Sequence, residues 1–241
     1  MASNEKKKTG FDIGIFVIVI VMLLFIGSVI FVISKDSSEE KSLMSESKQL
    51  SKLIFSSTRD KERMDKILNR TVTTGKFAEY EEAYKKYVND CYSNYVAIDE
   101  LLDNDDLKKY IDVKNYETDG PEFKTSLEEI RNYKTELTEL LSKFNTCSTV
   151  DTALSYVSGK DEKSVEYKFY KDTLVNSIML SDKDKETLEK NIKSTKEMLD
   201  NEEELLLFLK NNDRFWSVIS GKIFFYADIE NEYNKYLNKL K

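Results

Sequence analysis

The side chains in this sequence that could recognise or transform a ligand are mainly aromatic and acidic, and no histidine accompanies them. The chain therefore lacks the base of Ser-His-Asp and Cys-His nucleophilic sites and a common nitrogen ligand of metal centres. Two cysteines are too few for a structural zinc site, and the sequence has no glycine-rich phosphate-binding loop. We predict a non-catalytic protein without cofactor or metal. Scattered carboxylate pairs leave acid–base chemistry open without singling out any residue.

A run of acids at Asp103-Asn104-Asp105-Asp106 raises the question of calcium. An EF-hand loop beginning at Asp103 needs glycine at its sixth position and glutamate at its twelfth. Those positions hold Lys108 and Lys114. The run is therefore interpreted as the end of one helix and the cap of the next short segment.

Aromatic residues recur at helical spacing in the segment 76–102. Phe77, Tyr84, Cys91 and Ile98 follow one another every seven residues, with Tyr80 and Tyr87 beside them. Such a stripe is more often core than an exposed recognition surface. The alternative is a ligand pocket between helices. A second stretch that is dense in aromatic residues surrounds Trp216. The candidate residues for a partner or ligand surface are therefore Tyr80, Tyr84, Tyr87, Trp216, Phe224 and Phe225.

The two cysteines, Cys91 and Cys147, could pair if the body lies outside the cytoplasm. If helices 76–102 and 122–145 form an antiparallel hairpin that turns near residue 112, Cys147 lies about 14 residues beyond the level of Cys91. That is roughly 21 Å along the helix axis, whereas a disulfide needs Cα atoms within about 7 Å. This geometry argues against pairing, although another packing would allow it.

The uncharged stretch Ile13–Ile33 predicts how the chain is held in the cell. A helix over these residues would be roughly 31 Å long, which matches the hydrocarbon core of a bilayer. No small-x-small cleavage triplet follows it, so we expect an uncleaved signal anchor over residues 11–34. The three lysines Lys6–Lys8 favour a cytoplasmic tail over residues 1–10 and an extracytoplasmic body.

Charge narrows the choice of partners for the body. The chain has a net charge of -7, and residues 1–34 contribute three lysines against Glu5 and Asp12, so the remaining residues carry -8. Bulk charge therefore argues against binding nucleic acid or anionic lipid headgroups. Interleaved lysines and acids are typical of solvated helix faces.

The body is predicted to be helical because glycine is scarce and Pro121 is the single proline. Residues 35–75 resemble a helical stalk with a thin apolar stripe of Leu43, Leu50, Ile54 and Leu68, and residues 76–241 a helical bundle domain. Gly120-Pro121 and Ser181 indicate helix starts. The last helix is predicted from about Asp213 to the end, although Gly221 could break it.

The expected fold class is all-α: a single N-terminal transmembrane helix followed by an elongated helical-bundle or coiled-coil-like body. The expected function is a membrane-anchored interaction or scaffold module on the extracytoplasmic side. Alternatives are a small-molecule-binding or sensor-like bundle and a cytosol-facing membrane tether. The expected partners are the lipid bilayer, through residues 11–34, an unidentified protein, and a second copy of the chain packed along the stalk stripe. Nucleic acid is not expected.

Overall fold

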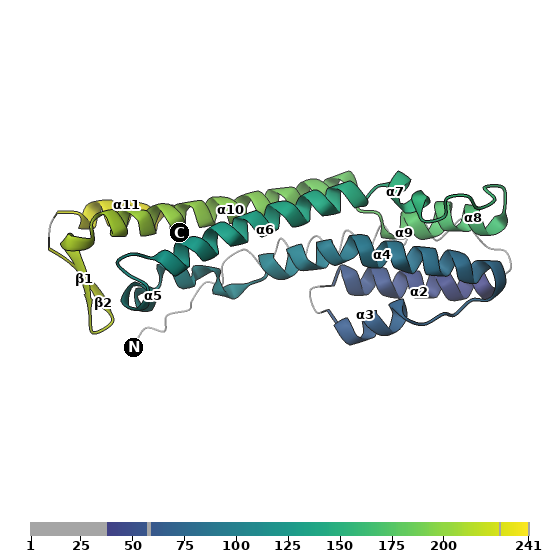
Figure 1. The fold of residues 1–241 in the computed structure, drawn as a ribbon, viewed down its shortest axis with the longest axis horizontal. Coiled ribbons are helices and arrows are strands. Elements are labelled where there is room, and N and C mark those ends of the chain that lie inside the picture. Colours follow the sequence, from purple (N-terminus) through teal and green to yellow (C-terminus); the bar gives the residue numbers. More distant parts are fainter. Residues whose placement is uncertain (1–37, 57–58, 227, 241) are drawn as a thin grey trace, which may run out of the picture. The chain divides into compact units, whose positions relative to one another are not determined.

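The computed structural model describes residues 38–56, 59–226 and 228–240, and these are mostly helical, as predicted. The elements in chain order are α2 (Ser38–Ile54), α3 (Lys61–Leu68), α4 (Gly75–Leu102), η1 (Asp105–Ile111), α5 (Val113–Thr118), α6 (Lys124–Cys147), α7 (Val150–Ser155), α8 (Val165–Phe169), η2 (Tyr170–Val175), α9 (Asn176–Ile178), α10 (Asp182–Asn211), η3 (Asp213–Phe215), β1 (Trp216–Ile219), β2 (Lys222–Phe225) and α11 (Glu230–Lys239) (Figure 1).

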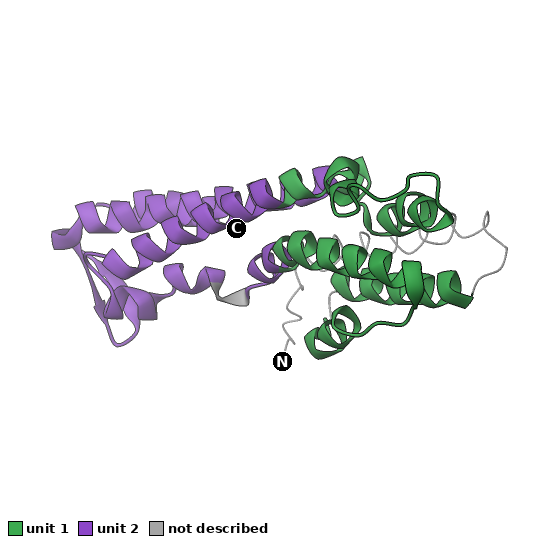
Figure 2. Cartoon of the chain, turned by 45° about the vertical axis from the view of Figure 1, so that its right-hand side comes forward, with its two compact units in different colours: residues 1–96, 144–184 green, residues 97–143, 185–241 purple. Residues whose placement is uncertain are grey.

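The chain divides into two compact units (Figure 2). Unit 1 contains the described residues up to Val96 together with Phe144–Asp184, and unit 2 contains Ala97–Lys143 and Lys185–Lys241. The predicted membrane anchor at residues 11–34 lies outside the described part of the chain. Within the described part, no helix has the length and apolar character needed to cross a bilayer.

In unit 1, the predicted stalk packs into the interior of its own chain. Leu43, Leu50 and Ile54 on α2 are all buried, and α2 packs beside α3, α9 and η2. The stripe that we considered as a seam for a second copy is therefore covered within the chain. A homodimer remains a prediction, but these three side chains are not available to form it.

A buried ionic cluster joins α2 to α4 in unit 1. The ammonium of Lys85 donates to Glu46, to Glu81 Oε1 at 2.5 Å and to the carbonyl of Arg70 at 2.6 Å. Glu81 also accepts from the backbone N–H and the hydroxyl of Thr73 at 2.9 and 2.5 Å. Burial alone would raise the pKa of Glu81, but the hydrogen bonds from Lys85 and Thr73 lower it. The guanidinium of Arg70 also pairs with Glu46, so two cations face the two carboxylates and the cluster fixes α2 to α4.

Cys91 and Cys147 form a disulfide with Cα atoms 5.5 Å apart, contrary to the hairpin geometry expected from the sequence. The expected turn near residue 112 is wrong, because η1 and α5 continue the outgoing arm as far as Asp119. Residue 119 is midway between the cysteines along the chain. Hydrogen bonds from Tyr133 to the carbonyl of Leu101 and from Tyr110 to Glu129 follow nearly the same register.

In unit 2, α10 contributes a regular core-facing seam. Seven of its eight buried residues alternate in steps of four and three along the helix, and Leu205 widens this seam: Leu188, Ile192, Thr195, Leu199, Glu202, Leu206 and Leu209. This 3.5-residue repeat is typical of helices that pack side by side. The start of α10 is as predicted, with Ser181 Oγ accepting from the backbone N–H of Asp184 at 3.2 Å.

The predicted terminal helix is wrong over residues 216–225, which form an antiparallel hairpin, and α11 begins only at Glu230. Ser220 and Gly221 both have positive φ, at 50° and 72°, the backbone of a two-residue hairpin turn. The flanking residues are largely β-branched or aromatic, which favours strands. The apolar residues here fit a strand period of two as well as a helical period. Because Gly221 supplies the turn, the chain adopts the strand alternation.

Candidate interaction surface

The predicted tyrosine stripe of α4 is core. Tyr80, Tyr84 and Tyr87 are all buried in unit 1. Tyr84 shares a hydrogen bond of 2.8 Å with Ser47, and Tyr80 lies under the ammonium of Lys160, which is 5.3 Å from its ring centroid. Burial raises the pKa of Tyr84 and of Tyr87, so both phenols stay neutral. These residues hold helices together and do not form an exposed recognition stripe.

Trp216 does not join those tyrosines, because it belongs to unit 2. It stacks on Phe123 with ring centroids 5.8 Å apart and an interplanar angle of 16°, and its indole N–H donates to the carbonyl of Leu209 at 2.7 Å. A Cβ at Gly120 would lie 2.4 Å from the carbonyl oxygen of Tyr116 and 3.0 Å from the Trp216 ring. Glycine therefore allows the turn before α6 to lie directly against this indole.

The hairpin has an inner face that rests on the unit 2 core. The strand register places Trp216 opposite Phe225 and Val218 opposite Ile223 on the same face. All four side chains pack into the apolar cluster formed by α5, α6, α10 and α11. The ring of Phe225 lies 5.0 Å from that of Tyr233 on α11. The inner face thus anchors the hairpin.

The outer face of the hairpin presents apolar side chains to solvent. We define this face by Ile219, Phe224 and Tyr226, whose exposed fractions are 53%, 44% and 63%. Ser217 and Lys222 lie among them in the register, and the hydroxyls of Ser217 and Tyr226 share a hydrogen bond. Isolated exposed apolar residues are ordinary, but three on one side of a hairpin whose strands have four residues each form a patch.

The backbone of the hairpin adds a second recognition element. In the described part of the chain the sheet has two strands, so β2 bonds to β1 along one edge and has no strand partner along the other. β1 also lies beside α5. Unpaired backbone N–H and C=O groups on a strand edge are a template for another extended chain. The outer edge of β2 and the outer face therefore form one continuous candidate surface.

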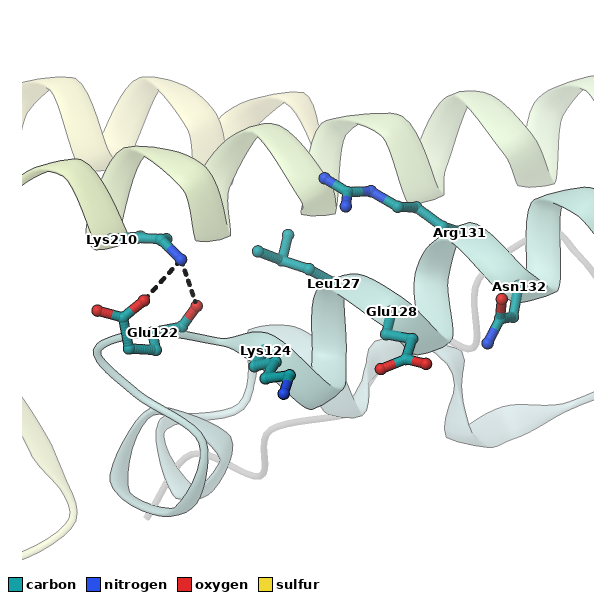
Figure 3. A pocket seen from close by; sticks show the side chains of 7 residues that line it. All are labelled: Glu122, Lys124, Leu127, Glu128, Arg131, Asn132 and Lys210. Atoms are coloured by element: carbon teal, nitrogen blue, oxygen red, sulfur yellow. Dashed lines mark hydrogen bonds and ion pairs between the residues drawn. The ribbon is translucent and has the colours of Figure 1, made fainter.

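A shallow groove of about 470 Å³ runs along α6 in the same unit (Figure 3). Leu127 and Arg131 point toward α10, whereas Lys124 and Glu128 lie on the other side of α6 (Figure 3). Lys210 pairs with Glu122 at 2.7 Å, and Arg131 pairs with Glu203 at 2.8 Å. An anionic ligand would have to break these pairs, so the groove is a weaker candidate than the hairpin.

Glu202 is the unusual titratable group of unit 2. It is 1% exposed, and neither carboxyl oxygen accepts a hydrogen bond from any described residue. Burial raises its pKa to about 8, an effect that Lys108 partly offsets. No described set of three or more cysteine, aspartate and glutamate side chains could hold a metal ion.

The sequence-predicted site residues thus fall into three groups. Tyr80, Tyr84 and Tyr87 lie in the core of unit 1, Trp216 and Phe225 support the hairpin from within unit 2, and Phe224 alone among them is exposed. Sequence reasoning missed Ile219, which it placed on the apolar face of a helix, and also missed Glu202. It included Tyr226 only as a member of the aromatic-dense stretch around Trp216. The sequence did contain a signal for Glu202: an acid stands between Leu199 and Leu206 at the position where the repeat predicts a buried apolar residue.

No family model, curated protein or solved structure matches this chain.

Proposed function

We propose that this protein is a membrane-anchored, non-catalytic interaction module, held outside the cytoplasm, whose binding surface is the outer face and open edge of the β1–β2 hairpin. The observation that carries the proposal is the unequal treatment of the two hairpin faces. The inner face is packed on the core, while Ile219, Phe224 and Tyr226 are left to solvent at 44% exposure or more. Leaving such a patch in water is unfavourable unless a partner covers it.

The partner that fits this surface is an extended polypeptide segment. Strand addition along β2 would satisfy its unpaired backbone groups, while alternate side chains of the incoming segment would cover Phe224 and Tyr226 and extend toward Ile219 on β1. A two-stranded hairpin is marginal alone and gains stability from a third strand. An anionic membrane surface fits less well, because the backbone N–H of Gly221 at the hairpin tip is already bonded to Glu117 and the chain is acidic.

The location outside the cytoplasm is supported by the disulfide between Cys91 and Cys147. Disulfides persist in oxidising compartments and are rare in the reducing cytoplasm. The Cys91–Cys147 pair therefore favours the extracytoplasmic orientation over the cytosol-facing tether. This orientation agrees with the lysines that precede the predicted anchor.

Site-specific photo-crosslinking in native membranes tests the proposal. A photoreactive residue is introduced at Ile219, Phe224 or Tyr226, and at Val165 as a control with 63% exposure in unit 1. We expect one protein adduct shared by the three hairpin positions and none at Val165. The substitution Phe224→Asp should reduce the adduct formed from position 219, because it places a charge in the apolar contact.

Other products would contradict the proposed partner. Adducts of twice the chain's mass would identify a second copy, and lipid adducts would identify the membrane surface. Equal labelling at Val165 and at the hairpin would mean that the outer face has no specific partner.

A further inference from the structure

Glu202 occupies a position at which the α10 repeat places an apolar residue. It lies three residues after Leu199 and four before Leu206, and both leucines are buried in the apolar cluster of unit 2. A carboxyl at this position points into the core, where an unpaired charge is costly. Glutamate at this position therefore makes the fold less stable than an apolar residue would. Such a residue is often retained for a functional reason.

The contrast with the acids of unit 1 makes this clear. Glu46 and Glu81 are equally buried, but both accept hydrogen bonds from the Lys85 ammonium. Glu81 also accepts from three further donors, the backbone N–H groups of Val72 and Thr73 and the Thr73 hydroxyl. Glu202 accepts none from the described residues. Without compensation, a buried carboxyl takes up a proton and stays neutral.

The described groups around Glu202 are mainly phenols, and Lys108 is the cation that acts on the Glu202 carboxyl. From the elements packed against this part of α10, the charged and titratable groups that act on Glu202 or on its phenol neighbours lie on η1, α5, α6 and α11. They are Lys108, Lys109 and Tyr110 on η1, Asp112 and Tyr116 at α5, Glu129 and Tyr133 on α6, and Tyr233 on α11. Lys108 is exposed, and Tyr110 already donates to Glu129 at 3.1 Å. The hydroxyl of Tyr116 is buried and forms no hydrogen bond of normal geometry with the described residues.

The phenols beside Glu202 also support the hairpin. The Tyr116 ring lies 6.2 Å from that of Trp216 and 5.8 Å from that of Phe123. Tyr233 packs against Phe225, and the two tyrosine hydroxyls act on each other's ionisation. A movement that brings the hydroxyl of Tyr116 or Tyr233 to an ionised Glu202 would therefore also shift the rings that these tyrosines contact beneath the inner face.

We propose that Glu202 is a proton-operated switch beneath the hairpin: its neutral form keeps the aromatic cluster packed, and its ionisation loosens the cluster and changes how the outer face is presented. On ionisation the carboxyl proton passes to bulk water, and no other group changes its covalent state. The consequence for the outer face rests on the proposed function, whereas the loosening of the cluster does not.

The composition makes the switch specific. The chain has no histidine, and both cysteines are bonded to each other. Ordinary aspartates and glutamates are fully ionised above about pH 6, and lysines and tyrosines titrate only near pH 10. In the part of the chain that the structure describes, Glu202 is the carboxyl whose pKa is raised, and it enters this otherwise quiet range.

The intrinsic fluorescence of Trp216, the single tryptophan, reports on this cluster. We would record its emission for the full chain in lipid nanodiscs between pH 6 and 9.5, for the wild type, Glu202→Gln and Glu197→Gln. Glu197 is an exposed acid five residues earlier on the same helix and serves as the matched control. A third variant, Glu202→Leu, covers the case in which glutamine itself disturbs the core.

We expect the wild type and Glu197→Gln to show a red shift with a midpoint near pH 8, and both Glu202 variants to show none. A flat wild-type profile, or the same shift in the Glu202 variants, would overturn the proposal. The photo-adduct at position 224 should change at least threefold between pH 6 and 9 in the wild type and stay constant in Glu202→Gln. A constant wild-type adduct would overturn the coupling to the outer face. No adduct at any pH would instead refute the proposed function.

Discussion

Replacing Glu202 by leucine should stabilise unit 2 by an amount that depends on pH. The pKa of Glu202 is about 8 in the folded protein against an ordinary value of 4.5, because burial disfavours the carboxylate. Folded protein therefore holds a proton that the unfolded chain releases above about pH 4.5. The stability available with a neutral Glu202 is fully present below pH 4.5 and is lost as pH rises to about 8.

The size of this loss follows from the same two values. Each pH unit within the window costs about 1.4 kcal/mol, so the wild type has lost about 3.5 kcal/mol at pH 7 and roughly 4.5 kcal/mol at pH 8, where the carboxyl is half ionised. No discount for solvent screening is needed, because Glu202 is 1% exposed. Leucine at this position carries no such penalty. The gain from Glu202→Leu should therefore grow by about 1.4 kcal/mol per pH unit between pH 5 and pH 8.

Urea unfolding of the full chain in detergent micelles, followed by Trp216 emission, measures this gain. The slope of the gain against pH is the decisive quantity, because any constant packing benefit of leucine cancels from it. Glu197→Gln is the control and should reproduce the wild-type pH dependence. A gain that stays constant from pH 5 to pH 8 would refute the reasoning, since it would mean that Glu202 is already ionised and compensated in the folded protein.

Three further predictions address other parts of the structure. Removing the disulfide with Cys91→Ala and Cys147→Ala should lower the free energy of unfolding of unit 1 by about 4 kcal/mol, because the cysteines are 56 residues apart and their link restricts the unfolded chain. Hydrogen exchange of α4 measures this loss, and unchanged protection would contradict the prediction. Lys85→Met should cost about 3–5 kcal/mol, because it leaves Glu81 buried without its cation and Glu46 with Arg70 alone. Lys86→Met, which removes an exposed pair, should leave the melting temperature nearly unchanged. Gly120→Ala should cost about 1–3 kcal/mol and shift Trp216 emission, because the added methyl meets the Tyr116 carbonyl and the indole; an unshifted spectrum would show that the turn gives way easily.

Long periodic segments were predictable because burial selects a helical repeat over many residues. The 76–102 stripe and the Ser181 start correspond to α4 and α10. The terminal segment was not predictable by the same signal, since the spacing of Ile219, Ile223 and Tyr226 fits a helix, and the choice depended on the backbone at Ser220-Gly221. The geometric argument against the disulfide failed for a related reason. The residues of η1 and α5 show no strong apolar periodicity, so the sequence did not locate the turn between α4 and α6.

The candidate site was predictable only in its residue types. Phe224 and Trp216 were singled out because this stretch is dense in aromatic residues, but their assignment to opposite faces depends on strand alternation. The tyrosine stripe was recognisable as core because an aromatic repeat at helical spacing is usually buried. Glu202 could be identified as a candidate site residue only from the packing of unit 2, since glutamate on an exposed helix face is ordinary in an acidic chain.

The claim on which the proposed function depends is that the body lies outside the cytoplasm, and protease treatment of intact cells tests it most directly. Protease added from outside should digest the described residues 38–240 and leave a short fragment that contains the predicted anchor and tail. Loss of the Trp216 region should need no lysis. Full protection of the body in intact cells, with digestion only after lysis, would contradict the account and place the hairpin surface in the cytoplasm.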